Sequence, residues 1–270
     1  MINSHLGLKL AFLLAASVVL TSCQTSKPAD DGTPVPTVAT SAAQPSSPSS
    51  VPSSAPLVSN APPLAPEAQM ALNTQLIGAA TNNDSASVVA LLADGAQLEF
   101  KGADGRTALV AATKSNAVAA ARTLMEAGAN VNAQDDLQDS AFLYAGAEAL
   151  DEILLMTLAH GADVKSTNRY GGTALIPACE HGHVSTVKIL LAAEVPVDHV
   201  NNLGWTGLLE AVILGTGGAA HQEVVRLLIE AGANVNLADS NGVTALAHAQ
   251  ATGQGAVAQL LLDAGAHGAP

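Results

Sequence analysis

Small and apolar residues recur along this chain in a pattern with a period of 33 residues. The pattern is a hexapeptide that opens with Thr or Ser and continues mainly with Ala, Leu and Val. Copies begin at Thr107, Ser140, Thr173, Thr206 and Thr244, and a degenerate copy begins at Thr74. Every step between them is 33 residues except the last, which is 38. A second marker closes each unit in the same register: Gly95-Ala96, Gly128-Ala129, Gly161-Ala162, Glu194-Val195, Gly232-Ala233 and Gly265-Ala266. A fixed period of this size predicts a solenoid of stacked repeats.

One unit, residues 102–134, illustrates the elements that the pattern predicts. Gly105 lies in a polar turn, where a positive φ is readily adopted, and Thr107 is placed to cap a short first helix. A second helix is expected from Ala117 to Ala127, because apolar residues follow helical spacing there. Gly128 is then expected to be the residue just past the end of this helix.

These motifs resemble the ankyrin repeat family, whose unit runs through Thr-Pro-Leu-His-x-Ala, Gly-His, a Val-Val-x-Leu-Leu-Leu helix and Gly-Ala. The family's spacing is reproduced by Gly182-His183 with Val187-Lys188-Ile189-Leu190-Leu191, and by Val224-Val225-Arg226-Leu227-Leu228. The resemblance covers roughly residues 70–268 and implies an all-α solenoid of about six helix-turn-helix units with short hairpin loops. The repeat domain is expected over residues 67–270, with units near 70–101, 102–134, 135–167, 168–200, 201–238 and 239–268.

The chain departs from the family pattern at two places that predict local differences. Glu194-Val195 replaces Gly-Ala, so the loop that ends the fourth unit is expected to be built differently. The fifth unit is five residues longer, around Thr216 to Ala220, and this insertion is expected to protrude from one face of the stack. His221, beside the insertion, is expected to lie in the same loop.

The first 22 residues predict an export signal. Lys9 precedes an apolar run, Leu10 to Leu20, that is too short to span a bilayer in the mature chain. Leu20-Thr21-Ser22-Cys23 resembles the lipobox of bacterial lipoproteins, which implies cleavage before Cys23 and lipidation of its sulfur. The alternative is an ordinary signal peptide with an incidental Cys. Because Gln24 rather than Asp follows, the resemblance implies the outer membrane, with the chain facing the periplasm.

Residues 23–66 are expected to be a disordered tether behind the lipid. Ten of the thirteen prolines lie between Gln24 and Pro66, among Ser, Ala and Thr and with few large apolar residues. Such a segment cannot bury enough apolar surface to offset the entropy of ordering it.

Charge and composition restrict the classes of partner. From Glu67 onward the chain has 21 acidic and 8 basic residues, a net charge of −13. A surface this acidic repels nucleic acid and anionic lipid, so a protein with a basic surface is the expected partner. Apart from Cys23 the chain has one cysteine, Cys179, so no disulfide within the processed chain is expected.

The densest group of reactive side chains is Cys179-Glu180-His181-Gly182-His183. A Cys and two His so close together fit a metal site, but the resemblance places Cys179 at a small core position and His183 at the turn between helices. No catalytic triad, phosphate loop or pair of carboxylates in a shaped pocket emerges from the sequence. We therefore expect no catalytic residue, metal or cofactor, and a contact role for Glu180 and His181.

Apolar residues at exposed positions of the repeat are the better functional signal. The position three before the Thr, normally polar at the hairpin tip, holds Leu137, Tyr170 and Leu203 in the third to fifth units. The set of predicted partner-binding residues is Leu137, Tyr144, Tyr170, Leu203 and Trp205, with Glu148, Glu180, His181 and Glu210 supplying polar contacts and charge. Aromatic residues rimmed by charge are typical of binding hot spots. The alternative is that these side chains pack locally into the adjoining hairpins.

The sequence thus predicts a membrane-anchored periplasmic protein that binds another protein through its concave central face and catalyses no reaction. Narrower forms are an immunity protein that neutralises a secreted effector and a support factor for an envelope stress enzyme. A metal-binding or catalytic protein centred on His181, His183 and the insertion, and a self-associating spacer, are the rivals from other classes.

Overall fold

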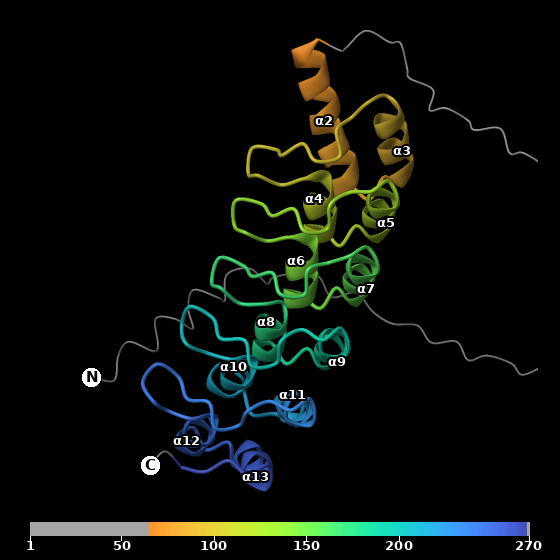
Figure 1. The fold of residues 1–270 in the computed structure, drawn as a ribbon. Helices are drawn as coiled ribbons and strands as arrows, with labels where there is room; N and C mark the ends of the chain where they lie inside the picture. The colour runs from red at the N-terminus through yellow and green to blue at the C-terminus, as the bar shows by residue number, and fades with distance from the viewer. Residues whose placement is uncertain (1–64, 269–270) are drawn as a thin grey trace, which may run out of the picture. The chain divides into compact units, whose positions relative to one another are not determined.

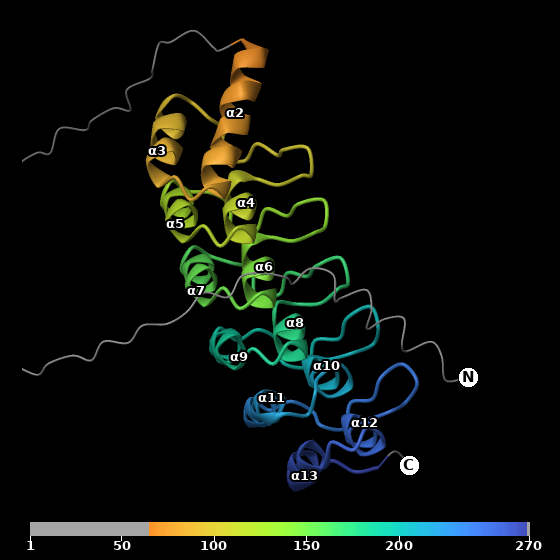
Figure 2. The ribbon, with the colours of Figure 1, turned by 180° about the vertical axis from the view of Figure 1, so that it is seen from behind.

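The computed structural model describes residues 65–268, where helices alternate with loops from one end to the other (Figures 1 and 2). The predicted export signal, Cys23 and nearly all of the tether lie outside these residues. Within them the chain forms twelve helices and no strand beyond one isolated antiparallel bridge between Ala238 and Thr244. None of these helices has the length and apolar character needed to cross a membrane. The all-helical repeat fold expected from the sequence is confirmed.

The helices form two columns, with hairpin loops on the side of the inner column away from the outer column (Figure 1). The inner helices are α2 (Pro66–Thr81), α4 (Ala108–Lys114), α6 (Ala141–Ala147), α8 (Leu175–Glu180), α10 (Gly207–Ile213) and α12 (Ala245–Ala251). The outer helices are α3 (Ser85–Ala93), α5 (Val118–Glu126), α7 (Asp151–Ala159), α9 (Val184–Ala192), α11 (Ala219–Glu230) and α13 (Gly255–Asp263). Each helix packs on its partner in the repeat and on its counterpart in the next repeat, and a continuous core of Ala, Leu and Val runs between the columns.

The recurring hydroxyl residue starts most inner helices by capping them. The Thr107 hydroxyl accepts a hydrogen bond from the Val110 amide at 3.3 Å, and Ser140, Thr206 and Thr244 do the same in their repeats. Thr173 differs, because Pro177 has no amide hydrogen to donate to the Thr173 carbonyl. The Ile176 amide donates to that carbonyl instead (3.2 Å), and α8 begins only at Leu175.

The first unit lacks the hairpin of the others, and the degenerate copy at Thr74 is not a helix start. Thr74 lies inside α2, where its hydroxyl donates to the Met70 carbonyl. The first half of α2 covers the loop after α3 instead. The Asn73 side chain accepts from the Gln97 amide at 2.8 Å, which replaces contacts that a preceding hairpin would make.

The loop that ends the fourth unit is built like the others, contrary to the expectation from Glu194-Val195. Glu194 adopts φ 59°, in the left-handed region where Gly128 lies at 91°. Its amide donates to the Leu191 carbonyl at 3.0 Å, as the Gly128 amide does to Met125 at 2.9 Å. The stack therefore fixes the geometry of this loop, and Glu194 bears backbone strain that glycine would avoid.

Replacing Glu194 by Gly should raise the free energy of unfolding by about 0.5–1 kcal/mol. Left-handed backbone costs a side-chain-bearing residue roughly 1–2 kcal/mol, and glycine's greater freedom in the unfolded chain offsets about 0.5–1 kcal/mol of that gain. Urea unfolding followed by circular dichroism measures the difference. The matched control is Gly128→Ala, which should lose stability because Gly128 has a left-handed backbone. No atom lies within 4 Å of the added Cβ, so this variant tests backbone strain without a steric clash. A loss of stability for Glu194→Gly would contradict the account.

Candidate functional site

An Asp or Asn side chain holds each of the last four hairpins rigid. In the third hairpin the Asp135 Oδ1 atom accepts from the amides of Leu137 and Asp139, both at 3.0 Å. Asn168, Asn201 and Asp239 make the same two bonds in their own hairpins. Each of these residues lies five positions before the recurring Thr or Ser, so the 33-residue period could have identified them in the sequence. The hairpin of the second repeat has Gly102 at the position of this Asp or Asn and therefore lacks the two side-chain hydrogen bonds.

The rigid turns of the third to fifth repeats display large apolar side chains at their tips. Leu137, Tyr170 and Leu203 are 47%, 42% and 43% exposed. The Arg169 guanidinium lies 4.5 Å from the centroid of the Tyr170 ring. Since the backbone of each tip is already fixed by two hydrogen bonds, these side chains can make contacts with little further loss of backbone entropy.

The other two predicted aromatic contacts are half-buried. Trp205 packs against the core, and its amide donates to the Asn201 side chain at 3.0 Å. Tyr144 lies on α6 with the Lys114 Nζ atom 5.0 Å from its ring centroid. The Lys114 ammonium also lies 2.7 Å from Asp135 and 2.9 Å from Asp139. For Trp205 and Tyr144 the structure therefore favours local packing over a free contact surface.

The residues predicted to make polar contacts differ in their exposure to solvent. Glu148 is exposed at the end of α6, and His181 is exposed at the end of α8. Glu180 is half-buried, whereas Glu210 is only 6% exposed. The expectation that Glu210 offers a negative charge to an approaching partner is wrong, because its carboxyl group points into the interface between α8 and α10.

Two carboxyl groups meet in that interface. Burial and the nearby charge of Glu180 together raise the pKa of Glu210 to about 8. Glu180 and Glu210 share a hydrogen bond, and the Asn201 side chain donates to Glu210 at 2.7 Å. Burial also raises the pKa of Glu180. Glu210 therefore keeps its proton at neutral pH, and this proton allows the two acidic side chains to lie together.

The structure does not bring the side chains of the Cys-His cluster together as a set of metal ligands. Cys179 is fully buried, and burial raises the pKa of its thiol, so it is held in the unreactive thiol form. His181 and His183 have ring centroids 5.4 Å apart. Across residues 65–268, no group of three or more His, Cys, Asp or Glu side chains is placed to hold a metal ion.

His221 corrects the expectation for the insertion. It is buried in α11 rather than lying in a loop, and its Nε2 atom is 2.9 Å from the Glu180 carbonyl oxygen. The added residues are partly used to begin α11 earlier, at Ala219, while Thr216 and Gly218 remain exposed. His221, directly after the insertion, therefore ties the fifth repeat to the fourth, and the last residues of the insertion are helical.

The repeat geometry agrees with the comparison with known families. The sequence profile described as "Ankyrin repeats (3 copies)" matches residues 63–135, 141–239 and 197–269. The chain belongs to the ankyrin repeat family. This class is typically non-catalytic, and its architecture implies protein–protein interaction.

The ankyrin repeats of this chain are similar to those of several other proteins, including two from bacteria. The ankyrin repeat protein YahD of Escherichia coli (strain K12) is 39% identical over 189 residues, which cover 70% of this chain and 94% of YahD. A crystal structure of an ankyrin repeat domain from Acinetobacter baumannii AYE is 55% identical with a TM-score of 0.70, covering 72% of this chain and 98% of that one. The structure of the ankyrin repeat protein EF0377 is 38% identical with a TM-score of 0.67, covering 69% and 96%.

The stability of the ankyrin domain should fall as pH rises from about 5 to about 8. The pKa of Glu210 is raised from 4.5 to about 8 in the folded state. The folded chain thus keeps a proton that the unfolded chain loses, so this contribution is complete below pH 4.5 and lost as pH rises through 8. Replacing Glu210 by Gln keeps an acceptor for Asn201 and should raise stability at pH 8 by on the order of 2 kcal/mol.

Urea unfolding at a series of pH values measures this dependence. The exposed Glu148→Gln variant is the control and should keep the slope of the native chain. If the free energy of unfolding of the Glu210→Gln variant changes with pH as steeply as that of the native chain, Glu210 does not keep a proton in the folded state.

Proposed function

We propose that this ankyrin repeat protein is held at the bacterial envelope by a lipid on Cys23 and binds another protein through its third to fifth hairpin tips. The observation that carries the proposal is the row of exposed apolar side chains, Leu137, Tyr170 and Leu203, on consecutive hairpins. Neutralising a secreted effector and supporting an envelope stress enzyme are two narrower forms of the same binding function.

The physical form of the tips supports recognition of a protein rather than of a small molecule. The tips lie one repeat apart along one side of the inner helices, as the loops in Figure 2 do. A row of separate apolar anchors on fixed backbone suits a broad protein surface, and aromatic anchors such as Tyr170 are frequent hot spots. A small ligand needs an enclosed pocket. The two hollows found in the described residues are open and lie between α7 and α9 and between α2 and α3, away from these tips.

The charge of the domain favours a partner with a basic surface. The net charge from Glu67 onward is −13, and exposed carboxylates such as Glu148 and Asp136 lie beside the tips or on the inner helices. Opposite charge raises the rate of encounter, while the apolar tips supply most of the affinity. The same charge disfavours nucleic acid as a partner.

Residues near the start of the sequence support the proposed location at the outer membrane. Leu20-Thr21-Ser22-Cys23 carries the likeness to a lipobox, and Gln24 follows it. The Pro- and Ser-rich residues after Cys23 would separate the ankyrin domain from the bilayer. In this proposal the domain lies in the periplasm on a tether anchored to the outer membrane.

Replacing the three tip residues Leu137, Tyr170 and Leu203 by Ser should abolish capture of the partner. The measurement is affinity purification from envelope extract followed by mass spectrometry, with the fold of each bait checked by circular dichroism. One protein retained by the native chain should be absent from the variant.

The matched control carries Ser at Met70, Val89 and Leu262, which are 62%, 56% and 46% exposed but lie outside the hairpins. It removes similar apolar area and should retain the partner. If the tip variant and the control retain the same proteins equally, the hairpin tips are not the binding surface.

Replacing Cys23 by Ser should release the protein from the membrane. Lipid attachment requires the thiol, so the variant should lose incorporation of labelled palmitate and move from the membrane to the aqueous fraction. The Cys179→Ser variant is the control and should stay in the membrane, because Cys179 is buried in the repeat core. Equal membrane retention of the Cys23→Ser variant would refute the anchor.

A further inference from the structure

Ion pairs bridge some of the junctions between successive outer helices. Arg122, the fifth residue of α5, lies 2.9 Å from Glu152, the second residue of α7. Lys188, the fifth residue of α9, lies 3.7 Å from Glu223 of α11. A cation at the fifth position thus contacts a carboxylate of the next repeat.

The junction between α7 and α9 lacks both members of this pair. The fifth residue of α7 is Leu155, where α5 and α9 carry a cation. The second residue of α9 is Ser185, where α7 carries Glu152. Leu155 therefore stands where α5 and α9 carry the cation of the pair, and it is 53% exposed.

Small residues leave the same junction open at the carboxyl ends of its helices. The helices α5 and α13 end with Glu126 and Asp263, whereas α7 and α9 end with Ala159 and Ala192. An open groove of about 410 Å³ results. It is lined by Leu155, Leu158, Lys188, Ile189, Ala192 and Ala193.

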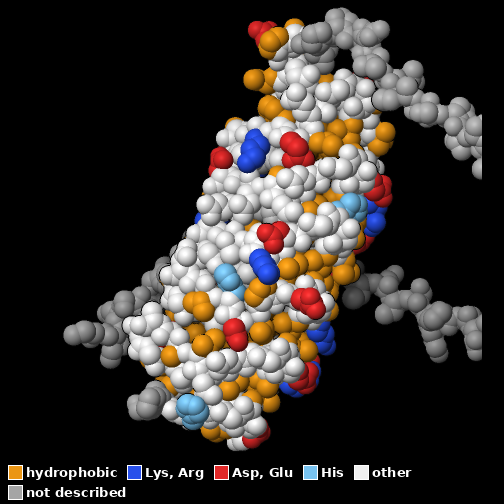
Figure 3. Space-filling model, in the orientation of Figure 1, with side chains coloured by type: hydrophobic (Ala, Val, Ile, Leu, Met, Phe, Trp, Pro, Cys, Tyr) orange, Lys and Arg blue, Asp and Glu red, His pale blue; other side chains and the backbone are white. Residues whose placement is uncertain are grey.

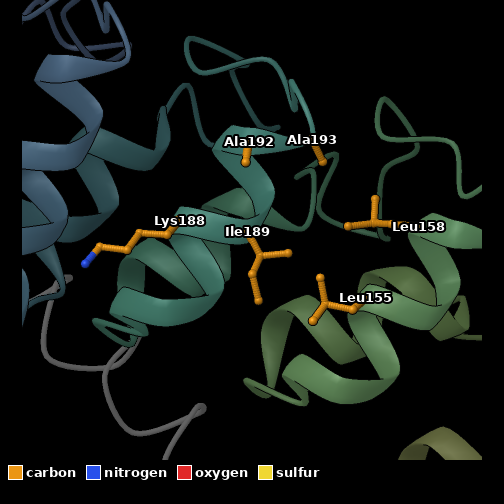
Figure 4. Close-up of a pocket in the computed structure, with 6 residues that line it drawn as sticks. All are labelled: Leu155, Leu158, Lys188, Ile189, Ala192 and Ala193. Carbon is orange, nitrogen blue, oxygen red and sulfur yellow. The ribbon is translucent and has the colours of Figure 1, made fainter. Parts of the chain in front are cut away.

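The lining side chains present an apolar surface to solvent. Figure 4 shows Leu155, Leu158 and Ile189 directed toward the space between the two helices. The Lys188 side chain extends away from them, in keeping with its contact to Glu223. Hydrophobic side chains are also visible on the outer-helix side in Figure 3, between scattered charged ones.

The surroundings of the groove are acidic. The helices α7 and α9 with the loops that follow them, residues 151–174 and 184–206, hold five acidic and three basic residues, a net charge of −2. Glu194 follows the lining residue Ala193 directly and is exposed, and no ion pair within residues 65–268 includes it. An apolar groove with an acidic edge is complementary to an apolar side chain that has a basic neighbour.

We propose that the groove between α7 and α9 is a second docking surface, which receives a large apolar side chain from a basic segment of another protein. The apolar side chain contacts Leu155 and Ile189, and an adjacent lysine or arginine lies near Glu194. This surface lies on the outer helices, so it is independent of the hairpin tips and leaves them free for a different partner.

The test begins with selection of 12-residue peptides from a random displayed library on the full chain. Synthetic copies of the enriched peptides are then titrated by fluorescence anisotropy. The enriched sequences should combine a large apolar residue with Lys or Arg, and the Leu155→Lys variant should weaken their binding at least tenfold. This substitution places a cation where α5 and α9 carry one, so the fold should be retained, as a thermal melt checks.

The matched control is Val89→Lys, which changes the fifth residue of α3, 56% exposed and outside the groove. It should leave the affinity unchanged. The proposal is overturned if no peptide is enriched, if the enriched peptides are acidic, or if they bind the Leu155→Lys variant as tightly as the native chain. It is also overturned if light scattering detects a dimer of the native chain that Leu155→Lys dissociates, since a second copy would then fill the groove.

Discussion

Each repeat of this protein buries its apolar side chains mainly against its own helix pair and the repeats beside it, and the rest of the structure depends on this stacking. Small residues allow the close approach. A Cβ atom added at Gly146 of α6 would lie 2.7 Å from the Cβ of Ala174 in the next repeat. Because every unit must fit its neighbours in this way, the backbone is nearly the same in each, even where the local sequence disfavours it. Glu194 adopts a left-handed conformation for this reason.

Stacking also separates the two surfaces of the domain. The hairpins lie beside the inner helices, and the Asp or Asn that fixes each of the last four turns places the tip at the same point of its repeat. The outer helices lie on the other side of the inner column, with their own side-chain positions in register (Figure 1). A difference between repeats, such as Leu155 where α5 and α9 carry a cation or Leu203 where the last repeat carries Asn241, is therefore visible on a regular background and can be related to contact with a partner.

Much of the fold could be predicted from the sequence because its signals are local and repeat. The 33-residue period located the repeats, the capping role of Thr107 and the left-handed Gly128. The first unit was misread because Thr74 has the spacing of a cap, while the longer helix α2 is stabilised by contacts to residues after α3. A prediction from local sequence is weak wherever the structure depends on contacts between residues that are distant in the chain.

The candidate site was predictable only at its hairpin tips, where turn chemistry by itself exposes the side chain. Glu210 and Trp205 occupy positions whose burial is decided by the neighbouring repeat, so no local pattern could distinguish contact from packing. The shared proton of Glu180 and Glu210 likewise depends on two helices meeting. The groove at Leu155 could be recognised only by comparing the same position in successive outer helices. The helix bounds in the structure make that comparison possible.

The central claim is that the hairpin tips touch a partner protein in the envelope. Photocrosslinking in living cells tests it most directly, with a benzophenone amino acid placed at Tyr170 and, as the reference, at Met70 on α2. The account predicts a single discrete protein adduct from position 170 and none from position 70. Adducts of equal intensity from both positions, or none from position 170, would contradict it.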